Sequence, residues 1–155
     1  MLAALEALVK LESPTEDLQA CQDVIKLASD LATKVLGTPA EIRDVNGRPV
    51  FWWGANNPEV VVLAHLDTVW PKGSFTPLWK VEGTKATGPG IFDMKAGFIQ
   101  ALYAMKGITG SVALVATTDE ETGSATSKEF IKQISAQSKA VLVVEASLDG
   151  MVKTG

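Results

Sequence analysis

The sequence is poor in the two residue types that most often build disulfide or zinc sites. Among its 155 residues there is one cysteine, Cys21, and one histidine, His65. A single cysteine excludes an internal disulfide and any zinc site made of several thiolates. We expect Cys21 to be a small buried apolar residue. One histidine also limits any reaction scheme that needs two.

Strong positive charge and long apolar runs are missing as well. The formal net charge is −4 and the chain has no Lys/Arg cluster, which argues against nucleic acid as the main partner. No apolar run reaches the ~18–20 residues needed to span a bilayer, so we expect no membrane partner. Glu6 and Lys10 interrupt the apolar residues at the start of the chain, which makes a poor secretory signal. We therefore expect a cytoplasmic location.

What the sequence does contain is the composition of an ordinary folded protein, with 46% hydrophobic and 21% charged residues. A length of 155 residues is typical of one domain that buries a core. Because we find no repeat, low-complexity tract or linker, residues 1–155 are predicted to form one unit with no second domain.

The first part of the chain favours helices followed by a hairpin. Met1–Leu11 has apolar residues at helical spacing. The segment Ser13–Glu16 has the residues of a helix start, and we expect that helix to end at Gly37. Asn46-Gly47 then predicts a turn between two strands, at Glu41–Val45 and Pro49–Trp53.

Strands and helices alternate in the rest of the chain. We predict strands buried on both faces at Glu59–Ala64, Ser111–Thr117 and Ala140–Val144, and helices at Met94–Met105 and Ser127–Ser135. This alternation predicts the α/β class, with a mixed, mostly parallel sheet and helices on both faces.

Acidic and imidazole side chains follow the predicted strands. His65 and Asp67 come directly after the first buried strand, and Asp93 follows a Gly-Pro-Gly turn. Asp119-Glu120-Glu121 and Glu145 come after the other two strands. Open α/β sheets bind ligands at the carboxyl ends of their strands. Imidazole nitrogen and carboxylate oxygen suit Zn²⁺ and similar divalent ions, so the sequence favours a metal site at this edge.

Each of these features also has an ordinary structural explanation. A lone histidine is more often a hydrogen-bonded structural residue, and Asp67 could cap a turn. Glu120 and Glu121 could be a solvated pair at the start of a helix. We favour a functional interpretation, because four such features, each at the end of a predicted strand or in the loop that follows, rarely occur together by chance.

The charges indicate how such a site would be organised. Several carboxylates in one cleft repel one another unless cations lie between them, and two divalent ions bridged by one carboxylate would neutralise them. Asp67 points the same way as His65 in an extended chain and can accept a hydrogen bond from its other ring N–H, which fixes the tautomer. Glu120 and Glu121 point differently, so one can bind metal while the other acts as general base. We expect Lys95, which follows Asp93 by two residues, to lie on the surface of a helix.

Four segments of the sequence resemble a known family: Val62–Val69, Ala86–Gly97, Thr118–Ser124 and Val144-Glu145. Their order, spacing and local residues are similar to those of the M20 family of metallopeptidases. This group contains glutamate carboxypeptidase and the acetylornithine and succinyl-diaminopimelate deacylases. Thr68-Val69 resembles the glutamate carboxypeptidase branch. The resemblance implies a zinc-exopeptidase-like catalytic domain.

The resemblance also implies a ligand set for two divalent ions. His65 and Glu145 would bind one ion, Glu121 would bind the other, and Asp93 would bridge both. Zn²⁺ is the first expectation, and Co²⁺ or Mn²⁺ are alternatives that the ligand types leave open.

The same resemblance implies the chemistry. Glu120 would be the general base and acid, and Asp67 would orient His65. A non-proline cis peptide bond is implied at Asp93-Met94. The substrate would be a small peptide or an N-acyl amino acid, cleaved at the amide bond next to a free C-terminal amino acid.

The sequence departs from the family pattern in two respects. Family members have a second ligating histidine late in the chain, and an inserted lid and dimerisation domain after the segment that corresponds to Glu145–Gly155. Neither is present here. We therefore expect residues 1–155 to be the N-terminal segment of one catalytic domain, with one metal site incomplete and activity absent or impaired. The full-length form is expected to be a homodimer.

Two alternatives remain open at this point. The chain could be a non-catalytic metal-binding or oligomerising fragment that pairs through an open sheet edge. It could also belong to another two-metal peptidase family with a similar sheet, although the residues around Asp93 and Glu120 make this weaker.

Overall fold

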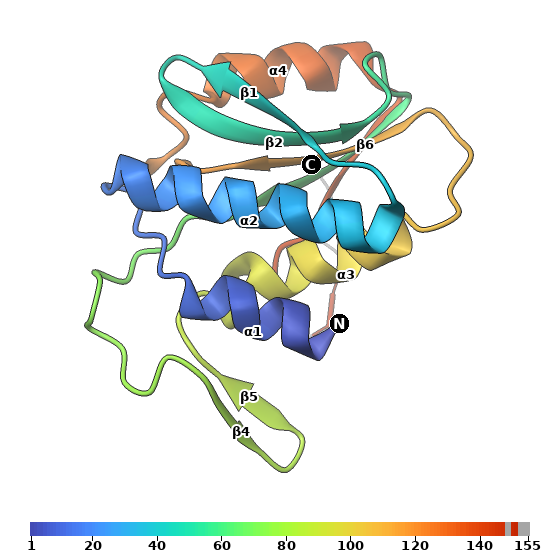
Figure 1. Cartoon of the computed structure of the whole chain (residues 1–155). Coiled ribbons are helices and arrows are strands. Elements are labelled where there is room, and N and C mark those ends of the chain that lie inside the picture. Colours follow the sequence, from blue (N-terminus) through green and yellow to red (C-terminus); the bar gives the residue numbers. More distant parts are fainter. Residues whose placement is uncertain (148–149, 152–155) are drawn as a thin grey trace.

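The computed structural model in Figure 1 describes residues 1–147 and 150–151. Its helices are α1 (Leu2–Lys10), α2 (Leu18–Leu36), α3 (Ala96–Ala104) and α4 (Lys128–Gln137). Its strands are β1 (Glu41–Val45), β2 (Arg48–Gly54), β3 (Val60–His65), β4 (Lys80–Glu82), β5 (Lys85–Thr87), β6 (Val112–Thr117) and β7 (Ala140–Val143). Two short helical turns, Ile91–Lys95 and Glu120–Thr122, complete the described elements.

Five strands form one mixed sheet in the order β1-β2-β6-β3-β7. β3 is parallel to both β6 and β7, whereas β2 is antiparallel to β1 and β6. Four of the five strands therefore point in the same direction, which confirms the predicted mixed, mostly parallel sheet. β4 and β5 form a separate hairpin that projects from the body (Figure 1).

Helices lie on both faces of the sheet, as predicted. Helices α1, α2 and α3 cover one face (Figure 1), where Leu8, Ile25 and Phe98 belong to the same core as Leu114 of β6. On the opposite face, Ile134 of α4 packs with Trp52 and other strand residues. Successive residues of a strand point to opposite faces, so each central strand contributes to both cores.

The local turn predictions are confirmed where the turn chemistry is strong. Asn46 and Gly47 both have positive φ, of 52° and 84°, which is the backbone of a tight hairpin turn. Gly37 ends α2 in the left-handed conformation, and its N–H donates to the carbonyl of Thr33.

The predicted start of the second helix is wrong. α2 begins at Leu18, and its N-cap is Asp17, whose side chain accepts from the N–H of Ala20. Ser13 instead donates from its side chain to the carbonyl of Leu66, 2.6 Å away, so it is bound to the loop after β3. A tertiary hydrogen bond to a distant segment has replaced a local cap.

The third predicted buried strand is mostly exposed. β7 forms the edge of the sheet beside β3, and Leu142 and Val143 are 55% and 57% exposed. The apolar run predicted a strand correctly, but it could not tell whether a neighbour covers it. None of the helices in the described part of the chain is both long and apolar enough to cross a membrane.

Candidate metal centre

The sheet brings the predicted site residues to one edge. His65 is the last residue of β3 and lies beside Thr117, the last residue of β6. Because β3 lies between β6 and β7, the segments that follow these three parallel strands meet at their carboxyl ends. Asp93 reaches the same place from the turn that precedes α3.

Three of the four predicted ligands form a compact group. His65 Nε2 lies 3.0 Å from Asp93 Oδ1 and 3.2 Å from Glu145 Oε1. One ligand atom from each of these residues lies within 4.8 Å of the others, a separation at which a single metal ion can be shared. His65 is buried, whereas the carboxylates face the solvent side of the group. One nitrogen and two carboxylate oxygens are a donor set that fits Zn²⁺.

Asp67 is buried behind His65. The Nδ1 atom of His65 is 3.3 Å from Asp67 Oδ1 and 3.2 Å from the main-chain oxygen of Asp67. Because both oxygens can only accept, Nδ1 carries a ring proton, and the other ring nitrogen, Nε2, faces Asp93 and Glu145. A contact of this kind is what an orienting role for Asp67 requires, and that role stays a prediction.

Asp67 is itself fixed by three donors. The hydroxyl of Thr15 donates to its Oδ2 at 2.7 Å, and the N–H groups of Glu120 and Glu121 lie 3.4 Å and 3.2 Å from its two oxygens. One buried carboxylate therefore positions both the imidazole and the turn that carries the two glutamates. Thr15 lies in the segment that was predicted to start a helix, and nothing in the sequence indicated its contact with Asp67.

The site has an excess of negative charge that changes its proton affinities. Burial by itself lowers the pKa of His65, but the carboxylates of Asp67, Glu145 and Glu120 outweigh it and raise that pKa to about 9. Burial raises the pKa of Glu121 and of Glu145 above 4.5, and the charge of Asp93 raises both further. For Asp67, hydrogen bonds from His65 and Thr15 outweigh burial, so its pKa lies below 3.8. A cation fits such a cluster.

Asp93 sits in an irregular turn that is held from two sides. The peptide bond between Asp93 and Met94 is cis, as the resemblance implied. The N–H of Lys95 donates to the carbonyl of Gly90 at 2.9 Å and closes the turn. Met94 is buried, and its sulfur lies 3.2 Å from the N–H of His65, so the turn packs directly on the end of β3.

Lys95 is not on a helix surface, and that expectation is wrong. The side chain is completely buried, and Nζ donates to the carbonyls of Leu8 and Leu11 at 2.9 Å and 3.1 Å. These carbonyls lie at the carboxyl end of α1, where the helix leaves its last acceptors unpaired. Burial lowers the pKa of Lys95 to about 7. Lys95 thus joins the Asp93 turn to α1. The feature of the sequence that could have indicated this contact is the end of the helix predicted within Met1–Leu11, because its last carbonyl groups need a donor.

The two glutamates of the Glu120–Thr122 turn have different surroundings. Glu120 Oε2 lies 3.8 Å from His65 Nε2, and the side chain is half exposed. Glu121, the fourth predicted ligand, lies outside the three-residue group. Together with Asp93 it lines a cavity of about 420 Å³, so these two carboxylates face a common space.

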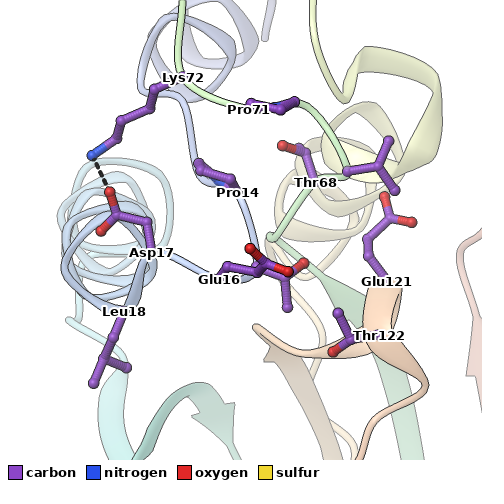
Figure 2. A pocket seen from close by; sticks show the side chains of 11 residues that line it. Pro14, Glu16, Asp17, Leu18, Thr68, Pro71, Lys72, Glu121 and Thr122 are labelled. Carbon is purple, nitrogen blue, oxygen red and sulfur yellow. Dashed lines mark hydrogen bonds and ion pairs between the residues drawn. The ribbon is translucent and has the colours of Figure 1, made fainter.

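A larger cavity of about 720 Å³ adjoins the metal centre (Figure 2). Pro14, Glu16 and Asp17 lie on one side of it, and Thr68 and Glu121 lie on the other. Lys72 closes the rim through an ion pair with Asp17 of 2.6 Å, drawn as a dashed line in Figure 2. Glu121 therefore faces a space of the size that a small peptide needs.

Comparison with known sequences gives one family and one relative. The model of peptidase family M20/M25/M40 matches residues 61–153. Carboxypeptidase G2 from Pseudomonas sp. (strain RS-16) is 33% identical over 105 residues. This alignment covers 63% of the chain and 25% of carboxypeptidase G2.

Comparison with solved structures gives the same fold. The M20 family metallo-carboxypeptidase Sso-CP2 from Sulfolobus solfataricus superposes with a TM-score of 0.76 at 21% identity, over 95% of this chain and 37% of that one. Human carnosine dipeptidase 1 superposes with a TM-score of 0.71 at 18% identity, over 92% and 37%. The chain thus spans a quarter to somewhat over a third of the length of these relatives.

Proposed function

Because the chain belongs to peptidase family M20/M25/M40, we propose that its protein is a two-metal hydrolase that cleaves the amide bond before a free C-terminal amino acid. The observation that carries the proposal is the convergence of His65 Nε2, Asp93 and Glu145 within 4.8 Å, with Glu120 at their side. These four side chains come from separate segments, and a structural role would not require them to meet.

The proposed metal ligands follow from this geometry and from the family. His65 and Glu145 would hold one divalent ion, Glu121 would hold a second, and Asp93 would contribute to both. Zn²⁺ is our first choice for both. When bound, the metal would supply Lewis-acid chemistry, which favours polarisation of the substrate carbonyl and stabilises negative charge on its oxygen. The first ion has three side-chain ligands and the second has two, so we expect the 155 residues alone to bind the second more weakly and to be impaired in activity.

The chain's own residues move and hold the protons. Glu120 is half exposed beside the metal group, so its carboxylate can accept a proton from the attacking water and return it to the leaving amine. Asp67 keeps the ring proton of His65 on Nδ1, which leaves Nε2 free to bind metal.

The similarity to carboxypeptidase G2 supports a carboxypeptidase more than a deacylase, with a small peptide or an N-acyl amino acid as substrate. We further propose that residues 1–155 form part of a single catalytic domain. The whole protein is proposed to be cytoplasmic and homodimeric.

Glu120→Gln tests the proposed function. In the zinc-loaded, full-length protein, this change should lower kcat for N-acyl amino acids and dipeptides by about 10²–10⁴-fold. The reason is that a neutral amide cannot accept the proton of the attacking water. Bound zinc, measured by atomic absorption, should stay the same. Glu129→Gln removes an exposed carboxylate on α4 and is the matched control. Near-normal turnover of Glu120→Gln would show that this mechanism is wrong.

The exposed β7 edge favours a second candidate, a metal-binding fragment that oligomerises through its sheet. Leu142 and Val143 are more than half exposed on this edge strand. Light scattering of the 155-residue chain tests this second candidate, since a stable monomer argues against edge pairing.

A further inference from the structure

The smaller cavity beside the metal centre has a largely apolar wall. It measures about 420 Å³ and is lined by Val69, Trp70, Phe75, Ile91 and Phe92. We call these five residues and the space between them the aromatic cavity. Asp93 and Glu121 line the same space, and Val69 and Glu121 also line the larger cavity of Figure 2. The aromatic cavity is therefore continuous with the metal centre.

Three apolar side chains of this cavity are unusually exposed. Phe92 is 74% exposed, Val69 is 61% exposed and Trp70 is 41% exposed. Single exposed apolar residues are common, but a group of them around a cavity next to polar groups is typical of a ligand site. Phe92 and Asp93 line the same cavity, so a group that covers Phe92 lies close to a proposed metal ligand.

The walls of the aromatic cavity are held in place by contacts within the chain. The rings of Trp70 and Phe75 meet edge to face, with centroids 5.1 Å apart. Gly90, at the start of the Asp93 turn, packs so closely on Thr68 that a Cβ there would lie 2.5 Å from Thr68 Cγ2. The loop that carries Val69 and Trp70 is thus fixed against the turn that carries Phe92. A preformed wall loses little entropy on binding.

We propose that the aromatic cavity binds an uncharged aromatic or large aliphatic group of the substrate, next to the amide bond that is cleaved. The inference rests on the proposed function. The five apolar residues carry no charge, and the charges of Asp93 and Glu121 are engaged when they bind metal, so an ionic group finds no free partner in the aromatic cavity. A volume of about 420 Å³ accommodates a phenyl ring.

The group could come from either side of the amide bond, and matched substrates distinguish the two. One pair is N-benzoyl- and N-acetylalanine, which differ in the acyl group. The other is N-acetylphenylalanine and N-acetylalanine, which differ in the amino acid. The variants are Phe92→Ala and Trp70→Ala. Ile108→Ala is the control, because Ile108 is an exposed apolar residue before β6, at the opposite end of that strand from the site.

We expect Phe92→Ala and Trp70→Ala to lower kcat/KM for the aromatic member of one pair by about tenfold or more, as for other lost contacts in apolar subsites. The value for N-acetylalanine should change less than about twofold, and Ile108→Ala should change neither. The pair that responds identifies the side of the amide bond. The proposal would be overturned if kcat/KM fell equally for both members of each pair, or did not fall at all. It would also be overturned if the variants changed only the oligomeric state of the protein.

A binding measurement keeps this inference separate from the proposed function. If the wild-type protein hydrolyses none of the substrates, the proposed function fails, but calorimetry can still follow N-benzoylalanine binding to the zinc-loaded protein. The aromatic cavity predicts that Phe92→Ala weakens this binding about tenfold. Unchanged affinity, or no binding to the wild type, would contradict it. Far-ultraviolet circular dichroism and zinc content serve as controls for folding.

Discussion

At the scale of single residues, Asp67 links the parts of the site. Its two oxygens hold Nδ1 of His65, the hydroxyl of Thr15 and the N–H groups of Glu120 and Glu121. A carboxylate with this many donors resists rotation, and the imidazole it holds keeps one tautomer. The precision of the site therefore depends on a residue that is not itself a proposed ligand.

Asp67→Asn should weaken zinc binding about 10–100-fold, as loss of a ligand's orienting partner does in other metal sites. The cause is that the amide offers an N–H where the structure needs an acceptor, so His65 and the glutamate turn are no longer aligned. Competition with a chromophoric chelator measures the affinity. Asp30→Asn, an exposed change on α2, should leave it unaltered. An unchanged affinity in Asp67→Asn would refute the orienting role.

At the scale of elements, Asp119 connects the end of β6 to the start of α4. Its carboxylate accepts from the N–H groups of Thr126 and Ser127 at 2.8 Å and 2.9 Å, and from both of their hydroxyls. These donors surround the amino end of α4, where backbone N–H groups lack partners within the helix. Although burial raises the pKa of Asp119, the hydrogen bonds from Ser127 and Thr126 outweigh it and hold that pKa below 3.8.

Asp119→Asn should lower the free energy of unfolding at pH 7 by about 1–3 kcal/mol, because charge-assisted bonds are lost and one buried donor is left unpaired. Since the folded pKa lies below the ordinary 3.8, this stabilisation is present above pH 3.8 and is lost as the pH falls through the folded pKa. Urea denaturation at several pH values measures the effect. A difference between wild type and variant that persists unchanged in acid would disprove this account.

At the scale of the whole molecule, the metal centre joins segments that are far apart in the chain. His65 ends β3, Asp93 precedes α3 and Glu145 follows β7. An ion bound to all three adds a crosslink between the middle of the sheet and its exposed edge. Metal binding at this group would therefore be coupled to folding.

Zinc at about 100 times its Kd should raise the free energy of unfolding by about 2.7 kcal/mol, with a matching rise in Tm. Removal of the metal with a chelator should reverse the rise. Differential scanning calorimetry of the 155-residue chain measures it. His65→Gln, which keeps a polar side chain but loses the imidazole ligand, should abolish the zinc effect. A Tm that does not change when zinc is added would argue against the proposed metal centre.

The sequence by itself determined most of the secondary structure and the motif residues. The Asn46-Gly47 turn, the apolar runs of β3 and β6 and the glycine end of α2 depend on near neighbours, and near neighbours are visible in a sequence. The order and surroundings of His65, Asp93, Glu120, Glu121 and Glu145 indicated the family for the same reason.

Only the tertiary structure decided which side chains are buried and what they meet. Ser13 and Thr15 bind the loop after β3 instead of capping a helix, Lys95 is buried under α1, and β7 is an exposed edge. The aromatic cavity likewise depends on how the loop with Trp70 packs on the turn with Phe92. Burial and hydrogen-bond partners are set by contacts between segments that are distant in the chain, and local patterns do not specify those contacts.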